Sequence, residues 1–150
     1  MDDLRDLYQE VILDHNKNPK NYHAMDDATH RAEGHNPLCG DQVEIFIKVE
    51  DNKVVDISFQ GHGCAISKAA SSVMTTLLKG KTLQEVHETF DKYQHLITAD
   101  MNEPVDIDEF GQLAVFAGVR EFPMRVKCAS LSWHTLISAL DNDNEIATTE

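Results

Sequence analysis

The spacing of apolar residues predicts a helix at the start of the chain, followed by a β-hairpin. The apolar positions of this helix share one face at three- and four-residue spacing: Leu4, Leu7, Tyr8, Val11 and Ile12. Asn and Pro residues follow His15, so the helix is expected to end near His15, with that residue as its cap. Residues 43–49 and 54–59 are rich in β-forming residues and are separated by four polar residues, which predicts a hairpin.

The apolar period changes after Gly63 to that of a helix. One helix is expected to end with Gly80 as its C-cap. Its apolar stripe contains Ile66, Ala69, Ala70, Val73, Met74, Leu77 and Leu78. A second stripe is expected to begin after Thr82: Leu83, Val86, Phe90 and Tyr93. The middle of the chain therefore predicts two consecutive helices.

The last third of the chain predicts a surface excursion and two more helices. Residues 98–108 are acidic and contain a proline, which is typical of an exposed segment. A short helix is indicated by Phe110, Leu113, Ala114 and Ala117. It breaks at Phe122 and Pro123, and a final helix follows whose apolar positions are Leu131, Leu136, Ile137 and Leu140. Residues 141–150 are expected to form a frayed acidic tail. Without repeats or linkers, residues 1–150 predict one α+β domain.

Composition limits the compartment and the partners. No stretch approaches the ~18 apolar residues of a membrane helix, and the N-terminus is acidic where a secretory signal is basic, so we expect a cytoplasmic protein with no membrane partner. The formal net charge of −13 repels phosphate backbones, so no nucleic acid partner is expected. A positively charged protein would be attracted, although the charge is equally explained by solubility.

The candidate chemistry lies in three cysteines on separate segments. Cys39 and Asp41 flank Gly40 at the entrance to the hairpin, Cys64 follows Gly63 before a helix, and Cys128 is expected at the start of the last helix. Helix N-termini favour thiolates, which bind metals and attack sulfur. If the segments meet, three thiolates and one carboxylate suit zinc, iron or an iron–sulfur cluster. Each cysteine is otherwise a small buried apolar residue.

Two histidines are alternatives to Asp41 as the fourth ligand. His35 and His62 lie close to Cys39 and Cys64 in the sequence, and imidazole is a common zinc ligand. Exposed histidines in loops are nevertheless common, so Asp41 is the preferred choice. A closed structural zinc site without chemistry is a further alternative.

Three segments together resemble the U-type iron–sulfur assembly proteins: Asn36-Pro37-Leu38-Cys39-Gly40-Asp41, Gly61-His62-Gly63-Cys64-Ala65-Ile66-Ser67 and Arg125-Val126-Lys127-Cys128-Ala129-Ser130-Leu131-Ser132-Trp133. The resemblance runs from about Leu4 to Leu140. It implies a three-stranded antiparallel sheet with helices packed on it (SufE/IscU-like), with residues 30–34 as the third strand.

Two features resemble the SufU branch rather than IscU-like scaffolds, namely Lys127 before the last cysteine and the 63 residues between Cys64 and Cys128. The SufU branch implies a zinc-dependent sulfurtransferase that accepts persulfide sulfur from a SufS-type cysteine desulfurase and supplies downstream SUF assembly proteins. The alternative is a scaffold on which an iron–sulfur cluster is assembled and transferred. A third hypothesis is an interaction module stabilised by zinc.

The expected roles of the site residues follow from mobility and charge. Cys39, Asp41, Cys64 and Cys128 are the candidate metal ligands, and the three cysteines would equally hold a cluster. Cys39 and Asp41 are expected to form an exchangeable half on a loop, opposite two cysteines fixed at helix starts. Cys39 is therefore the predicted sulfur acceptor, and Arg125 is a candidate for stabilising the persulfide. Trp133 is expected to be a packing residue.

Overall fold

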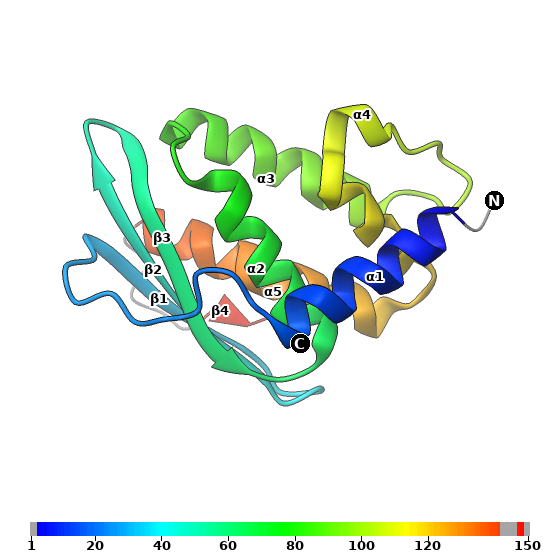
Figure 1. The fold of residues 1–150 in the computed structure, drawn as a ribbon, viewed down its shortest axis with the longest axis horizontal. Coiled ribbons are helices and arrows are strands. Elements are labelled where there is room, and N and C mark those ends of the chain that lie inside the picture. The colour runs from blue at the N-terminus through cyan, green and yellow to red at the C-terminus, as the bar shows by residue number, and fades with distance from the viewer. Residues whose placement is uncertain (1–2, 142–146, 149–150) are drawn as a thin grey trace.

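The computed structural model describes residues 3–141 and 147–148, and places helices against one face of an antiparallel sheet (Figure 1). The sheet contains β1 (His30–Asn36), β2 (Asp41–Glu50) and β3 (Lys53–His62), with β2 in the centre. This confirms the predicted three-stranded antiparallel sheet. A two-residue strand, β4 (Ala147–Thr148), pairs in parallel with β1 at Gly34 and His35. The predicted acidic tail is therefore wrong at β4, while residues 142–146 and 149–150 lie outside the described residues.

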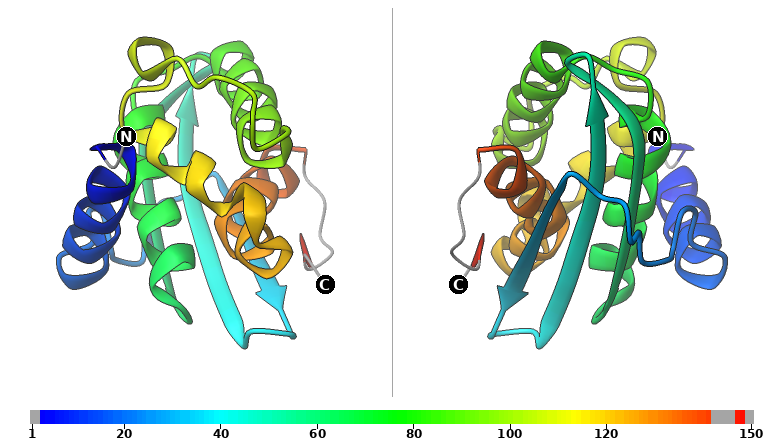
Figure 2. Two further views of the ribbon diagram at one scale, coloured as in Figure 1. Left: turned by 90° about the vertical axis from the view of Figure 1, so that its right-hand side faces the viewer. Right: turned by 90° about the vertical axis from the view of Figure 1, so that its left-hand side faces the viewer.

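Two helices cover the sheet and the remaining helical segments pack on them. α2 (Ala65–Leu78) lies against β3, and α5 (Pro123–Leu140) lies against β1 and β2 (Figure 2). α1 (Asp3–Lys17) packs on α2 and on a 3₁₀ segment, η1 (Gly111–Glu121). α3 (Leu83–Thr98) packs on η1 and α5. No helix among the described residues is long and apolar enough to cross a membrane.

The hairpin is longer than the apolar runs predicted because its turn contains only two residues. Asp51 and Asn52 have φ values of 51° and 65°, the left-handed pair that matches the twist of a tight hairpin. Glu50 consequently pairs with Lys53. The inward positions of both strands are fully buried or nearly so: Val43, Ile45, Ile47, Ile57 and Phe59. β2 begins at Asp41 and β3 ends at His62, with Gln42 paired to His62, so the candidate ligands Asp41 and Cys64 lie together at the open end of the hairpin.

The junction between α2 and α3 follows local capping rules. The Thr82 side chain accepts the main-chain N–H of Glu85, and the Glu85 side chain accepts that of Thr82, which forms a capping box. α2 ends one residue earlier than expected, with Lys79 as its C-cap. Gly80 has a φ of 91°, and its N–H donates to the carbonyl of Val54 at 2.7 Å rather than back to the helix.

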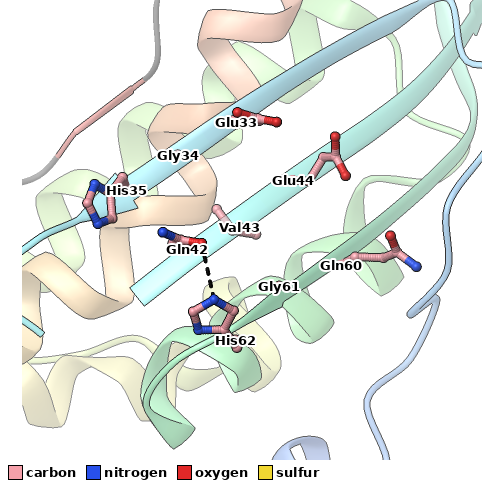
Figure 3. Close-up of a pocket in the computed structure, with 9 residues that line it drawn as sticks. All are labelled: Glu33, Gly34, His35, Gln42, Val43, Glu44, Gln60, Gly61 and His62. Atoms are coloured by element: carbon pink, nitrogen blue, oxygen red, sulfur yellow. Dashed lines mark hydrogen bonds between the residues drawn. The ribbon is translucent and has the colours of Figure 1, made fainter. Parts of the chain in front are cut away.

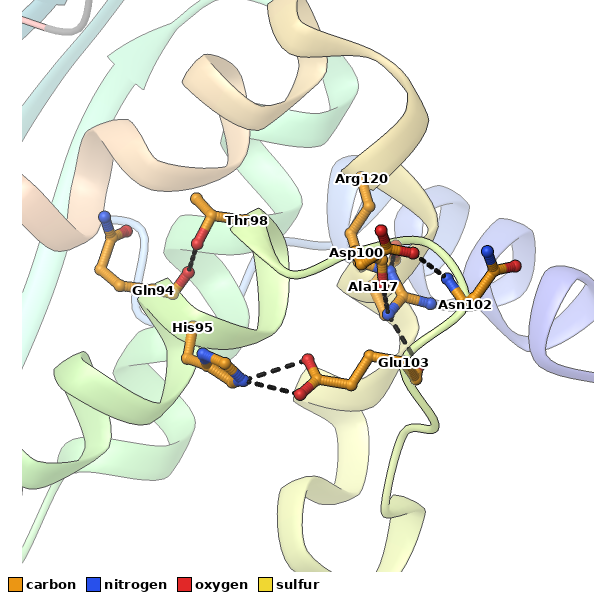
Figure 4. A network of polar contacts seen from close by, with 8 residues as sticks. All are labelled: Gln94, His95, Thr98, Asp100, Asn102, Glu103, Ala117 and Arg120. Carbon is orange, nitrogen blue, oxygen red and sulfur yellow. Dashed lines mark hydrogen bonds and ion pairs between the residues drawn. The ribbon is translucent and has the colours of Figure 1, made fainter.

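The predicted excursion forms an exposed loop, bounded by α3 and by α4 (Ile107–Phe110). Figure 4 shows how one cation fixes it: the Arg120 guanidinium donates to the carbonyls of Ala117, Asp100 and Glu103. The Glu103 carboxylate also pairs with His95 at 3.0 Å. The short helix expected after Phe110 is the 3₁₀ segment η1, a distinction that apolar spacing does not resolve.

Side chains remote from the cysteines hold the helices together. Trp133 is fully buried and stacks on Tyr93 with ring centroids 4.5 Å apart, which confirms its packing role. His15 does not cap α1, which continues to Lys17. Its Nδ1 instead lies 2.6 Å from the hydroxyl of Ser72 on α2, and burial lowers the pKa of His15. His15 thus links α1 to α2 across the interior.

Candidate metal centre

Cys39 lies near the tip of the short turn between β1 and β2. The carbonyl of Asn36 accepts the N–H groups of Cys39 and Gly40 at 3.3 and 2.9 Å, and Gly40 takes a φ of 74°. The Asn36 side-chain oxygen also accepts the N–H of Leu38 at 3.2 Å. Cys39 is half-buried, whereas its neighbour Leu38 is 56% exposed. The turn is therefore held chiefly by hydrogen bonds to Asn36.

Asp41 is the first residue of β2 and is fully buried. Its Oδ1 accepts the main-chain N–H of Cys64 at 2.7 Å, and its Oδ2 lies 3.7 Å from Cys64 Sγ. The expectation that Asp41 shares a mobile loop with Cys39 is wrong, because strand pairing and this hydrogen bond fix the carboxylate. A Cβ on Gly63 would lie 2.2 Å from Asp41 Oδ1, so glycine is required for this close approach.

Cys64 is the N-cap of α2, as the sequence predicted. Its Sγ accepts the N–H of Ser67 at 3.4 Å. A hydrogen bond from the Cys128 thiol lowers the pKa of Cys64 to about 7, and the N–H of Ser67 acts in the same direction against burial. The Cys64 thiol therefore ionises more readily near neutral pH than an ordinary cysteine thiol.

Cys128 does not begin a helix, contrary to prediction. α5 starts at Pro123, with Phe122 as its N-cap, so Cys128 lies in the second turn beyond the free N–H groups. It is 4% exposed, and its Sγ lies 3.5 Å from Cys39 Sγ. Its hydrogen bond to Cys64, together with burial, raises the pKa of Cys128. Packing rather than a helix dipole fixes this thiol.

The four side chains converge although they come from three separate segments of the chain. Ligand atoms of Cys39, Asp41 and Cys128 all lie within 4.8 Å of one another, and Cys64 contacts Asp41. All three cysteines are free thiols. Three sulfurs and one carboxylate oxygen match the ligands and the number that tetrahedral zinc takes, so the donor set fits the metal. The same set fits a cluster with one oxygen ligand.

The two alternative histidines lie on the other face of the sheet. His35 and His62 follow the outward alternation of their strands, as Figure 3 shows. His62 Nε2 lies 3.1 Å from the side-chain oxygen of Gln42, which is also outward. Asp41, one position from Gln42, faces inward toward Cys64. The geometry thus favours Asp41 over either histidine.

Comparison with known proteins identifies the family of this chain. A model of the NifU-like N-terminal domain matches residues 7–129. The chain belongs to this family. It is 38% identical over 136 residues to the zinc-dependent sulfurtransferase SufU of Bacillus subtilis (strain 168), covering 89% of this chain and 88% of that protein. It is 36% identical over 137 residues to the iron–sulfur cluster assembly scaffold protein IscU of Streptococcus pyogenes serotype M1, covering 91% and 84%.

Solved structures of the family share the fold. A crystal structure assigned to an iron–sulfur cluster assembly scaffold protein for the SUF system of Fervidobacterium islandicum AW-1 matches with a TM-score of 0.80 and 37% identity, covering 91% of this chain and 98% of that one. The NifU-like N-terminal protein of Brucella abortus matches with a TM-score of 0.80 and 25% identity, covering 92% and 94%. The U-type resemblance read from the sequence is thereby confirmed.

Sequence reasoning missed Tyr8 as a neighbour of the site in this NifU-like chain. Burial raises the pKa of Tyr8, the nearby Cys64 and Cys128 raise it further, and the charge and hydrogen bond of Arg125 act in the opposite direction. Arg125 itself is exposed and lies over the ring of Phe122, 4.3 Å from its centroid. Tyr8 therefore lies near Arg125, Cys64 and Cys128. In the sequence Tyr8 is visible only as a member of the apolar stripe of the first helix, a pattern that indicates packing.

Proposed function

We propose that this chain is a zinc-dependent sulfurtransferase of iron–sulfur cluster assembly. It accepts persulfide sulfur from a SufS-type cysteine desulfurase and supplies downstream SUF assembly proteins. One observation carries the proposal: Cys39 is on a half-exposed turn, whereas Asp41, Cys64 and Cys128 are fixed in β2, at the start of α2 and in α5. One ligand can therefore move while three remain in place.

Cys39, Asp41, Cys64 and Cys128 are the proposed zinc ligands. When bound, zinc keeps the thiols deprotonated and masks them from oxidation. Three thiolates and one carboxylate leave a divalent site with an excess of negative charge. Lys127, which is half-buried beside Cys128, and Arg125 offset that charge.

The proposed transfer is a thiol–persulfide exchange at Cys39. The Cys39 thiolate attacks the terminal sulfur of the desulfurase persulfide, so a sulfur–sulfur bond forms at Cys39 as the bond to the desulfurase cysteine breaks. The desulfurase cysteine leaves as a thiolate, and Cys39 becomes the persulfide. No external oxidant is needed because the sulfane sulfur keeps its oxidation state.

A cluster scaffold is the second candidate function. The Streptococcus pyogenes relative is named a scaffold, and three cysteines with Asp41 are also able to hold a cluster. Metal content distinguishes the two: one zinc per chain in colourless protein supports sulfur transfer. Stoichiometric iron and sulfide in brown protein after anaerobic purification would support the scaffold.

The decisive experiment combines desulfurase turnover with mass spectrometry of the trapped persulfide. Wild-type protein should stimulate cysteine desulfuration and carry the added sulfur on Cys39. Cys39→Ser should fold and retain the fixed ligands but neither accept sulfur nor stimulate turnover. Cys64→Ser is the matched control: serine still caps α2, but a fixed thiolate ligand is removed, so zinc and the stability coupled to zinc binding should be lost together. Reproducible sulfur on Cys128 with Cys39 unmodified would contradict the assignment.

A further inference from the structure

The side chain of Asn36 contains a buried donor with no acceptor in the part of the chain that the structure describes. Asn36 is fully buried at the end of β1. Its Oδ1 accepts the N–H of Leu38, but its Nδ2 has no hydrogen-bond partner among the described residues. Buried amide groups are nearly always paired in native proteins, so this donor points to an acceptor that forms in another state of the site.

Asn36 is the strand partner of one candidate ligand and holds the turn of another. Asn36 pairs in register with Asp41, so the two residues share the inward face of the sheet. Its main-chain carbonyl also accepts the N–H groups of Cys39 and Gly40. Asn36 is thus both the anchor of the Cys39 turn and the neighbour of a fixed ligand.

The contacts of the site indicate the acceptor for Nδ2, since Asn36 itself holds the turn that carries the Cys39 sulfur. Asp41 Oδ1 accepts the main-chain N–H of Cys64, and Asp41 Oδ2 contacts the sulfur of Cys64. The sulfur of Cys64 already accepts the N–H of Ser67. In the described residues the Cys39 sulfur contacts the Cys128 thiol, at 3.5 Å, whose single proton is shared with Cys64. That proton is lost when Cys128 becomes a metal ligand, because metals bind the thiolate.

We propose that Asn36 Nδ2–H donates to the Cys39 sulfur when the site holds its metal. Metal ligands are generally oriented and tuned by such outer hydrogen bonds. This bond rests on the proposed metal site but not on sulfur transfer. It makes Asn36 a positioning residue: an N–H donor withdraws charge from the Cys39 thiolate, which weakens that ligand relative to Cys128. The movable ligand is thereby also the one most readily released.

The direct test is NMR spectroscopy of the ¹⁵N-labelled full chain loaded with ¹¹³Cd. A hydrogen bond to a cadmium-bound sulfur should give a scalar coupling between ¹¹³Cd and one Asn36 side-chain amide proton, and that proton should exchange slowly with water. The coupling should disappear in Cys39→Ser if Cys39 is the acceptor. A metal-loaded protein in which the Asn36 amide shows neither coupling nor protection would overturn the proposal.

Two variants test the consequence for the metal. Asn36→Asp keeps an oxygen for Leu38 but loses the donor, and Asn36→Ser keeps a shorter, neutral acceptor for the turn. Both should shift the thiolate-to-metal charge-transfer band of the cobalt(II) protein and change zinc affinity by about 10–100-fold. The exposed Asn102→Asp is the control and should change neither.

The outcomes separate this bond from the proposed function. Unaltered cobalt spectra and zinc affinity in both Asn36 variants would overturn the bond even if the desulfurase is stimulated. An Asn36–cadmium coupling without desulfurase stimulation would keep the bond and reject sulfur transfer. A wild-type chain that binds neither cadmium nor zinc would reject both.

Discussion

Replacing Gly63 by alanine should disrupt the site without removing any ligand. The added Cβ would lie 2.2 Å from Asp41 Oδ1 and 2.9 Å from Asp41 Cα, so the carboxylate must move. Gly63 also has a φ of 148°, a conformation that costs other residues about 1–3 kcal/mol. Moving the carboxylate breaks its hydrogen bond to the N–H of Cys64, worth about 1.5–3 kcal/mol for a charged acceptor.

These effects together predict a loss of about 3–5 kcal/mol in the unfolding free energy of the metal-free protein, measured by urea denaturation. Zinc affinity, measured by competition with a chromophoric chelator, should fall at least tenfold, since each ~1.4 kcal/mol is a factor of ten. Gly111→Ala is the control: its φ is 56°, but its Cβ meets nothing within 4 Å. It should cost about 1–2 kcal/mol and leave zinc affinity unchanged. Equal behaviour of the two variants would refute the steric argument.

Two further predictions concern Asp41 and His15. Asp41→Asn should keep an oxygen for the Cys64 N–H and preserve most of the metal-free stability. Asp41→Ala should lower the free energy of unfolding of the metal-free protein by about 1–3 kcal/mol. Equal midpoints of urea denaturation for the two variants would show that the hydrogen bond contributes nothing. Because burial lowers the pKa of His15 in the fold below its ordinary 6.5, the unfolded chain binds the proton more readily. The stability that neutral His15 contributes should therefore be fully present above about pH 6.5 and decline as pH falls below it. His15→Gln should reduce that decline. An unchanged pH profile of the unfolding free energy would contradict the role given to His15. The decline that remains should include His134, whose pKa burial also lowers.

Periodicity predicted most of the elements because their buried positions repeat with the period of a helix or a strand. The hairpin and α2 were predicted from runs whose inward residues are buried, and the capping box fixed the start of α3 at Thr82. The 3₁₀ form of η1 was not predictable from the same pattern, because the apolar stripe of a short 3₁₀ segment resembles that of an α-helix. Strand β4 was missed because two residues carry no period.

The convergence of the candidate ligands was predictable from the sequence, whereas the rigidity of each one was only partly so. Three cysteines with Asp41 stood out by residue type and glycine neighbours. The burial of Asp41 depends on the register of β1 and β2, which places it opposite Asn36. The depth of Cys128 in α5 follows from Pro123 at the first helical position, a start signal that the sequence contained. Contacts across the fold, such as those of Tyr8, left no local pattern.

The division between fixed and movable ligands follows from what each segment is attached to. Displacing Cys128 or Cys64 would disturb α5 or α2, which pack on the sheet, and displacing Asp41 would break the pairing of β2 and the hydrogen bond to Cys64. Displacing Cys39 disturbs a four-residue turn whose main-chain hydrogen bonds go to the single residue Asn36. Local opening has a low free-energy cost where few buried contacts are lost. The turn is therefore the part of the site that can move while the rest of the fold stays intact.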